Sequence, residues 1–240
     1  MFVLLCKNWA YCSFNFLFII NFTIMEVKLI SATKSLIEEM PLNAEELIVY
    51  IARVSNPANQ LNTSTADKLI NYMQINKHWS PFEMADMTVE ITTSRCITQQ
   101  ILRHRSFSFQ EFSQRYAKVT DFEPIQLRYQ ADKNRQSSTD ALSIEDSQYF
   151  EPRIKELLES MEALYLDMLE KGVAKESARF ILPLTTQTRM YMKGSVRSWI
   201  HYLLIRCDEH TQLEHRQIAE AIREIFKVEF PMISKAMSYV

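Results

Sequence analysis

The spacing of apolar residues predicts a helix-rich chain with a few strands. Ala85, Met87, Val89 and Ile91 alternate with polar residues, which is the period of a half-buried strand. A second short strand is expected over 26–31. The helical period predicts helices over these ranges: 44–54, about 63–76, 94 onward, 152–171, 175–182, 195–207 and 215–227. The pattern favours the α+β class, as a helix-rich single domain with a small mixed or antiparallel sheet.

Start and stop signals set the limits of several of these helices. Pro152 opens the clearest one, and Gly172 stands where its C-cap belongs. An Asn-Thr-Ser cap over 62–64 is expected to begin an earlier helix. Val54 and Ile75 are expected on the buried sides of their helices. The polar segment from Thr120 to Asp146 lacks a sustained period, which predicts a long loop that could cover a site.

The stretch over 103–116 reads RHRSFSFQEFSQRY and contains no aliphatic residue, which makes it a poor core segment. The helix that begins near Ser94 is expected to run into it. From Arg95 to Arg115 there are four arginines and one acid, Glu111, in a chain whose net charge is -2. An anionic ligand is therefore expected there. The alternative is a structural one, with cations at a helix C-terminus and a surface pair of Glu111 with Arg115.

The chain contains only two glycines, Gly172 and Gly194, and each stands alone. A Walker loop or a GxGxxG turn needs clustered glycines so that backbone amides can approach phosphates closely. Side chains must therefore hold the charge of any bound nucleotide, and the planar donor fork of arginine suits that task. A structural carboxylate such as Asp208 or Glu209 is the alternative partner for any single arginine. The candidates in apolar helical segments are Arg179, Arg189, Arg197 and Arg206.

Cysteine usage and overall charge favour an ordinary cytosolic protein. The four cysteines form no CxxC pair, which is typical of reduced thiols. A cysteine nucleophile is not excluded, but nothing around Cys96 or Cys207 marks one. Lys plus Arg total 27 and Asp plus Glu total 29, so no overall field draws the chain onto nucleic acid. His210 and His215 would be about 140° apart on a helix, which argues against a shared metal ion.

The first 24 residues differ from the rest of the chain. They are rich in Phe, Ile and Leu, with Lys7 as the only charge. The apolar run over 14–24 is shorter than the roughly 20 residues of a membrane span, and the cleavage site of a signal peptide is absent. We expect Met25 to be the natural start, residues 1–24 to be an extension outside the fold, and residues 25–240 to form the domain. A membrane anchor is the alternative.

The stretch over 103–116 resembles the signature RHRxxSxNxxSxR of the flavin-dependent thymidylate synthases, the ThyX type. Gln110 stands where that family usually has Asn. HWSPFE over 78–83 is similar to the family's HxSPFEH turn, with Met84 in place of the last histidine. The resemblance extends from Met25 to the C-terminus. Further matches are ARVS over 52–55, ARFILPL over 178–184, and Ser195-x-Arg197 followed by His201 and Arg206, where the family has Asn at 195 and often at 201.

The resemblance implies a homotetramer whose active sites lie at subunit junctions and bind FAD and dUMP. Methylenetetrahydrofolate would donate the carbon and NADPH the reducing equivalents, and dTMP would be the product. The flavin contacts that the resemblance implies are Ser80, Glu83, Arg103, His104, Arg105, Glu111, Ser195, Arg197 and His201. The dUMP contacts that it implies are Gln100, Arg103, Glu111, Phe112, Ser113, Gln114, Arg115, Arg179 and Arg206.

The chemistry of uracil makes Arg206 the candidate catalytic residue. Uracil C5 is a weak nucleophile, and other thymidylate synthases activate it by adding a cysteine at C6. Without a marked cysteine, a fixed arginine near N3 could stabilise negative charge on the pyrimidine electrostatically. Ser113 has no adjacent base, since its neighbour Arg115 is a cation, so we expect it to bind the substrate rather than to act as a nucleophile.

Two alternative functions fit parts of the same pattern. A non-enzymatic protein could hold single-stranded nucleic acid on the basic and aromatic stretch. The sequence pI of about 6.2 argues against the sustained positive face that such a protein needs. The second alternative is a flavin enzyme that acts on another pyrimidine nucleotide. We expect a cytoplasmic protein with no nucleic-acid or membrane partner.

Overall fold

The computed structural model describes residues 25–37 and 42–239 and confirms the α+β class. Its strands are β1 (Glu26–Ala32), β2 (Asp86–Ser94), β3 (Ser108–Glu111), β4 (Arg128–Gln130), β5 (Ser138–Ala141) and β6 (Gln187–Ser195). Its α-helices are α1 (Ala44–Ala52), α2 (Ala66–Ile75), α3 (Arg95–Ile101), α4 (Ile144–Glu170), α5 (Lys175–Ala178), α6 (Val196–Arg206), α7 (Leu213–Glu229) and α8 (Pro231–Ala236). The short 3-10 helices are η1 (Pro57–Asn59), η2 (Ser80–Glu83) and η3 (Arg179–Ile181).

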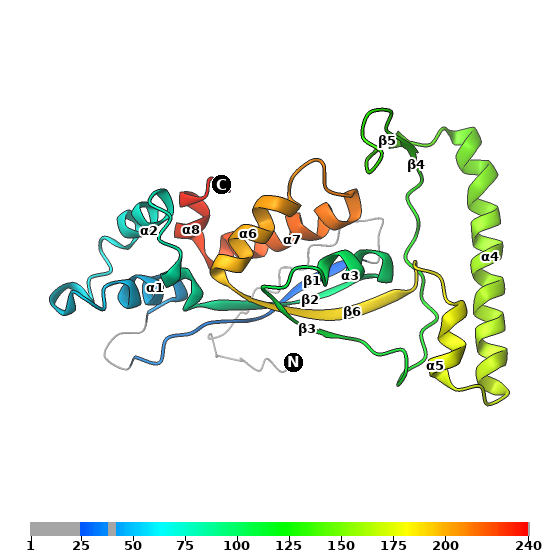
Figure 1. The fold of residues 1–240 in the computed structure, drawn as a ribbon, viewed down its shortest axis with the longest axis horizontal. Helices are drawn as coiled ribbons and strands as arrows, with labels where there is room; N and C mark the ends of the chain where they lie inside the picture. Colours follow the sequence, from blue (N-terminus) through cyan, green and yellow to red (C-terminus); the bar gives the residue numbers. More distant parts are fainter. Residues whose placement is uncertain (1–24, 38–41, 240) are drawn as a thin grey trace, which may run out of the picture.

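An antiparallel sheet in the order β1-β2-β6-β3 organises the described chain (Figure 1). β2 and β6 form its centre and pair from Asp86 opposite Ser195 to Ser94 opposite Gln187. The predicted alternation over 85–92 is confirmed, because the apolar members of β2 are buried. β6 alternates in the same way, although no strand is expected there from the sequence.

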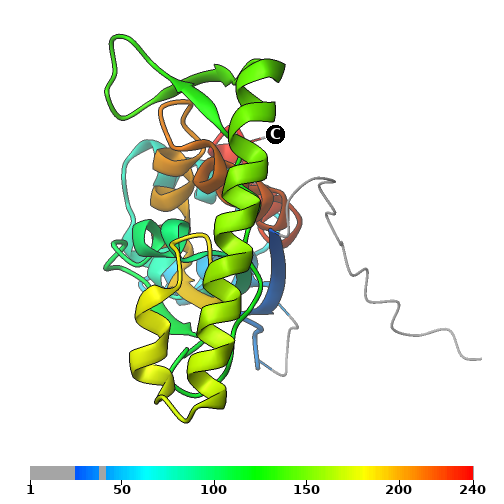
Figure 2. The ribbon, with the colours of Figure 1, turned by 90° about the vertical axis from the view of Figure 1, so that its right-hand side faces the viewer.

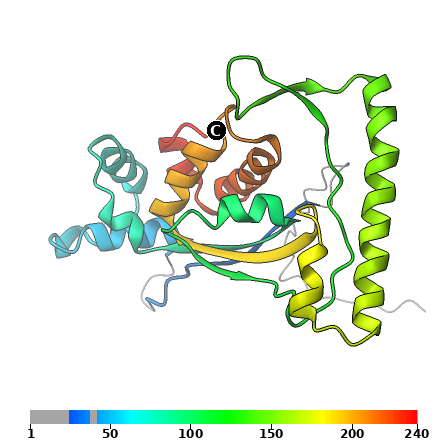
Figure 3. The ribbon, with the colours of Figure 1, turned by 45° about the vertical axis from the view of Figure 1, so that its right-hand side comes forward.

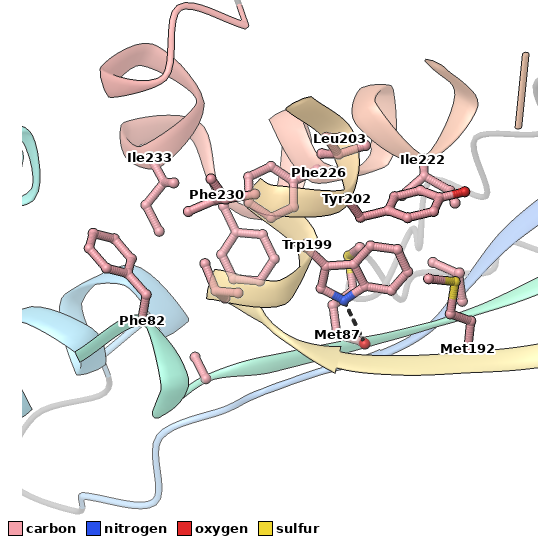
Figure 4. Close-up of a cluster of buried hydrophobic side chains, with 14 of the residues drawn as sticks. Phe82, Met87, Met192, Trp199, Tyr202, Leu203, Ile222, Phe226, Phe230 and Ile233 are labelled. Atoms are coloured by element: carbon pink, nitrogen blue, oxygen red, sulfur yellow. Dashed lines mark hydrogen bonds between the residues drawn. The ribbon is translucent and has the colours of Figure 1, made fainter. Parts of the chain in front are cut away.

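Helices α3, α6 and α7 lie on one face of this sheet, while α1, α2 and α8 gather near one end of it (Figures 1 and 3). The core between the sheet and the helices contains Trp199 and Tyr202 of α6 and Phe226 of α7 (Figure 4). The Trp199 indole N–H donates to the Met87 carbonyl at 3.0 Å, so this buried polar group is satisfied. The predicted helices over 195–207 and 215–227 are confirmed as α6 and α7.

Phe107 corrects the expectation that the stretch over 103–116 is a poor core segment. Its ring is buried and packs edge-on against Trp199, with ring centroids 4.7 Å apart. The ring also occupies the space that a side chain at position 194 would need. A Cβ built on Gly194 would lie 2.5 Å from Phe107 Cε1, which is an impossible contact. Gly194 therefore admits Phe107 to the core.

The long helix α4 stands apart from the sheet and packs against α5 and η3 (Figures 1 and 2). It begins at Ile144 rather than at Pro152, because Ser143 caps it by accepting a hydrogen bond from the Asp146 N–H at 3.1 Å. Pro152 lies inside the helix. The predicted C-cap glycine is confirmed, since Gly172 follows the helix with a φ of 82°.

Several other expectations were wrong. The region 120–146 is not one long loop, because β4 and β5 pair within it and α4 begins before its end. The helix after Ser94 stops at Ile101 and does not run into the stretch over 103–116, where β3 forms instead. The N-cap of α2 is Thr65 rather than a residue of 62–64. Val54 and Ile75 are exposed, because α1 ends before Val54 and Ile75 is the last residue of α2.

Residues 1–24, which carry the expectation of an extension or anchor, lie outside the described residues. Within 25–37 and 42–239, no helix has both the length and the apolar content that crossing a membrane requires.

Glu45 joins α1 to the start of α8 inside the core. Its carboxylate accepts hydrogen bonds from the backbone N–H groups of Met232 at 3.1 Å and Ile233 at 2.7 Å. These donors belong to the first turn of α8 and would otherwise lack partners. Burial raises the pKa of Glu45 to about 7, against the opposing effect of the two backbone donors.

Gly194→Ala should destabilise the protein by about 2 kcal/mol, because the new methyl group overlaps the Phe107 ring in a packed core. Urea unfolding monitored by circular dichroism would measure the loss. Gly172→Ala is the matched control, because nothing lies within 4 Å of its Cβ position and only the positive φ is unfavourable, at about 1 kcal/mol. Adding Phe107→Leu to Gly194→Ala should recover part of the loss. Equal losses for the two single variants would contradict the packing argument.

Glu45→Gln should change how stability depends on pH. The folded pKa of about 7 lies above the ordinary value of 4.5, so the unfolded chain ionises first as the pH rises. The stability that protonated Glu45 contributes is complete below about pH 4.5 and is lost as the pH rises to about 7. The loss amounts to about 3 kcal/mol relative to the variant. Unfolding free energies of both proteins across that range would show it, and parallel curves would exclude it.

Candidate active site

Several predicted site residues lie on the two helices that directly follow the central strands. Ser94 ends β2 and is the N-cap of α3, while Ser195 ends β6 and is the N-cap of α6. The structure collects the predicted residues into three groups, each built around one of these charged residues: Glu83, Arg206 and Glu111.

The first group joins η2 to the start of α6 through Glu83. The Ser195 hydroxyl donates to Glu83 Oε2 at 2.6 Å, and Arg197 donates to Glu83 Oε1 at 3.0 Å. Ser195 also accepts from the Ser198 N–H at 3.3 Å as the N-cap of α6. Ser80 begins the same 3-10 helix that ends at Glu83. Four predicted flavin contacts therefore lie on two joined segments.

The second group surrounds Arg206 at the end of α6. The Arg206 Nε–H donates to His104 Nε2 at 2.9 Å, so the proton of the neutral imidazole is on Nδ1. Burial, followed by the charges of Arg206 and His201, lowers the pKa of His104 to about 4. His104 accepts a hydrogen bond only from the Nε atom of Arg206. The two terminal nitrogens of Arg206 have no hydrogen-bond partner among the described residues. They are the groups that a ligand could use.

Gln100 belongs to the second group through its neighbour His215. The Gln100 Oε1 atom lies 3.3 Å from His215 Nδ1, and His215 Nε2 lies 3.1 Å from the Tyr202 hydroxyl. The His104 ring packs against Tyr202, with centroids 4.9 Å apart. The aromatic cluster that supports His104 therefore also holds Gln100, through His215.

The third group surrounds Glu111 at the end of β3. Its Oε1 atom accepts from the hydroxyl of Thr188 at 3.0 Å and from that of Thr98 at 3.4 Å. Arg95 NH1 lies 3.4 Å from the same oxygen, and Arg95 NH2 donates to the Phe112 carbonyl at 3.0 Å. The surface pair of Glu111 with Arg115, which belonged to the structural alternative, is not formed. Glu111 is instead fixed by α3 and β6.

The residues after Glu111 lead from the sheet toward α5. Ser113 accepts from the Arg115 backbone N–H at 3.3 Å, and the exposed Arg115 side chain lies 3.7 Å from Glu176. Arg179 begins η3 directly after α5. Gln114 is 5% exposed, and its buried Nε2 has no partner among the described residues. The side chain is therefore a candidate donor for a ligand.

Arg103 and Arg105 are exposed on either side of His104, and neither side chain has a partner among the residues described. The phenylalanines of the same stretch are less available than the exposed Tyr116. Phe107 is in the core, while Phe109 and Phe112 are partly buried. This burial weakens the alternative of a stacking platform for single-stranded nucleic acid. Arg189 is also separate from the three groups, since it lies 3.9 Å from Glu90 on the sheet.

Sequence reasoning missed the residues that hold the predicted ones in place. Thr98, Thr188 and Arg95 fix Glu111, while Tyr202 and His215 support His104 and Gln100. The alternation of β6 would have placed Thr188 on the side of Met190 and Met192, facing the helices. No local signal marks His215, because its partners lie on other elements.

The donor set fits a phosphate-containing flavin. Arg103, Arg105 and Arg197 supply cations, and the hydroxyl of Ser80 supplies a neutral donor. Neither glycine takes part in a phosphate loop, since Gly194 is covered by Phe107 and Gly172 ends α4. Side chains must therefore do what clustered backbone amides do in glycine-rich loops, as the sequence predicts.

Comparisons with known proteins show the family of the chain. The family model "Thymidylate synthase complementing protein" matches residues 35–232. The chain is 52% identical over 217 residues to the flavin-dependent thymidylate synthase of Synechocystis sp., covering 90% of this chain and 100% of that protein. This chain belongs to the flavin-dependent thymidylate synthase family. It is 34% identical to a Thermus thermophilus member over 190 residues, which cover 78% of this chain and 69% of that one.

A solved structure shares the fold of this flavin-dependent thymidylate synthase. The UMP/dUMP methylase PolB of Streptomyces cacaoi superposes with a TM-score of 0.77 and 24% identity. The match covers 90% of this chain and 95% of PolB. The predicted family and the helix-and-sheet architecture are thus both confirmed.

The described thiols of this family member are poor nucleophiles. Burial raises the pKa of Cys207 to about 11 and also raises the pKa of Cys96. Because the thiolate is the reactive form of cysteine, neither residue is prepared for attack on a pyrimidine. Among the described residues, Arg206 and its neighbours remain the candidates for activation.

Proposed function

We propose that the chain catalyses the reductive methylation of dUMP to dTMP, with FAD as cofactor, methylenetetrahydrofolate as carbon donor and NADPH as reductant. Membership of the flavin-dependent thymidylate synthase family supports thymidylate synthesis and a flavin. The observation that carries the finer proposal is the Arg206 guanidinium, which donates through Nε to neutral His104 and has two terminal nitrogens without a partner among the described residues. The expected setting is cytoplasmic.

Arg206 would activate dUMP by stabilising negative charge on the pyrimidine. A guanidinium stays protonated at all working pH values, and a fixed cation lowers the energy of a developing anion without reorganisation. His104 restrains the guanidinium through Nε. The raised pKa values of both described cysteines support this electrostatic route over a covalent one.

The other groups would bind the cofactor and the nucleotide. Bound FAD would supply the hydride that completes the methyl group. The proposed flavin contacts are Ser80, Glu83, Arg103, His104, Arg105, Glu111, Ser195, Arg197 and His201. The proposed dUMP contacts are Gln100, Arg103, Glu111, Phe112, Ser113, Gln114, Arg115, Arg179 and Arg206.

The proposal includes a homotetramer with sites shared between subunits. The three groups of site residues stand on different elements of the chain. The outer helix α4 exposes apolar side chains, with Leu157 55% and Leu164 52% exposed, and Phe180 of η3 is 83% exposed. Apolar surface of this kind is typical of an interface and supports contact with further copies of the chain.

The purified protein should carry flavin, and its NADPH oxidation should depend on dUMP and increase with the folate. The activation step is tested by Arg206→Ala, which should lower tritium release from C5-labelled dUMP about 100-fold to 1,000-fold. Flavin content should not change, because Arg206 is proposed to contact the pyrimidine. Absorbance of the bound flavin and a tritium-release assay would provide both measurements.

Arg135→Ala is the control for loss of an arginine, since Arg135 is exposed in the connection between β4 and β5. It should release tritium at the wild-type rate. Full activity of Arg206→Ala would refute the assigned role of Arg206.

Ser113→Ala should weaken dUMP binding and keep measurable turnover. An inactive variant that still binds dUMP would make Ser113 a nucleophile instead.

A further inference from the structure

A continuous chain of polar side chains runs behind the second group of site residues. Arg128 NH2 donates to Glu214 Oε1 at 2.7 Å, and both side chains are largely buried. Gln212 Nε2 donates to Glu214 Oε2 at 3.0 Å, and Gln100 Nε2 donates to Gln212 Oε1 at 2.6 Å. Beyond Gln100, the series of contacts continues from Gln100 Oε1 to His215 Nδ1 at 3.3 Å. It ends with His215 Nε2 and the Tyr202 hydroxyl, which are 3.1 Å apart. We name this set, from Arg128 to Tyr202, the polar relay.

The carboxylate of Glu214 determines the direction of every hydrogen bond in the polar relay. An ionised carboxylate only accepts, so Gln212 must turn its amide N–H toward Glu214 and its oxygen toward Gln100. Gln100 must then turn its own N–H toward Gln212 and its oxygen toward His215. The reverse arrangement would place the Gln212 oxygen against a carboxylate oxygen at hydrogen-bond distance, which is repulsive.

The same constraint fixes the tautomer of His215. Facing an amide oxygen, His215 Nδ1 must carry the proton, and Nε2 must accept from the Tyr202 hydroxyl. Burial, the charge of Arg206 and then His104 lower the pKa of His215 to about 3, so the ring stays neutral. Burial also raises the pKa of Tyr202, so its hydroxyl keeps its proton.

We infer that His215 is a positioning residue which, as the neutral Nδ1–H tautomer, fixes the carboxamide of Gln100 for the nucleotide. The orientation leaves one N–H of Gln100 Nε2 and one lone pair of Oε1 for a ligand. An amide that is free to flip would offer oxygen and nitrogen interchangeably, and the fixed amide offers a single pattern. The inference rests on the proposed function, because Gln100 is a proposed dUMP contact.

The tautomer can be measured without any substrate. Magic-angle-spinning NMR of flavin-loaded protein with isotope-labelled histidine distinguishes protonated from unprotonated ring nitrogens. The signals that disappear in the His215→Asn variant are those of His215. We expect a neutral ring with the proton on Nδ1 from pH 6 to pH 8. A proton on Nε2, or an imidazolium in that range, would overturn the polar relay.

Binding of dUMP tests the consequence for Gln100. The double variant Tyr202→Phe/His215→Leu removes both buried polar partners together, so that neither is left unsatisfied. Isothermal titration of flavin-loaded protein should show dUMP binding weakened about fivefold to tenfold, with flavin content unchanged. His215→Asn keeps a donor near the Nδ1 position and should stay within about threefold of wild type.

Tyr239→Phe is the matched control, because the Tyr239 hydroxyl donates to the Ile200 carbonyl of α6 at 3.2 Å, outside the polar relay. It should leave dUMP binding unchanged. Thermal unfolding would show that each variant is folded. A folded double variant that binds dUMP as tightly as wild type, or an equal loss in Tyr239→Phe, would overturn the positioning role. Failure of the wild type to bind dUMP would refute the proposed function, and the positioning role with it, while the tautomer would still be decided by NMR.

Discussion

The pairing of β2 with β6 is the constraint on which the site depends. The two strands are antiparallel and each continues into a helix without a loop, so α3 and α6 leave the same ladder from opposite ends. Strands of this length span about 30 Å. Both helices fold back over the same face of the sheet, where α6 is about 16 Å long and α3 about 10 Å long. The ends of the two helices therefore approach each other over the middle of the sheet. The contact of Arg206 with His104 occurs where they meet.

This geometry explains why part of the site was predictable from the sequence. The apolar helical pattern that begins at Ser195 marks a helix, and alternation over 85–92 marks the central strand. The motif at 103–105 is visible as a cluster of cations in a stretch without aliphatic residues, and Arg206 as a cation at the end of an apolar helical pattern. β6 was not predicted, because Arg189 was interpreted as a ligand candidate in a helical segment. That arginine stands on a face of the sheet away from the core.

The remaining features could not be read from local sequence because their causes are tertiary. Phe107 is buried only because Gly194, on another strand, leaves room for its ring. Pro152 resembles a helix start, yet Ser143 supplies a better N-cap two turns earlier, and the helix continues through the proline. His215 resembles a surface or metal-binding histidine until α6 and α3 place Tyr202 and Gln100 on its two nitrogens.

Arg206 is the charged residue among the second group of site residues, because the imidazoles of His104 and His215 are neutral. Burial, followed by the charge of Arg206, lowers the pKa of both His104 and His215. A second charge there would need its own partners in a poorly solvated place, whereas a neutral ring can accept a hydrogen bond and orient the guanidinium. Burial and the cation together keep both imidazoles neutral. If His104 were charged, it could no longer accept from Arg206, and the guanidinium would lose the hydrogen bond that restrains its Nε atom.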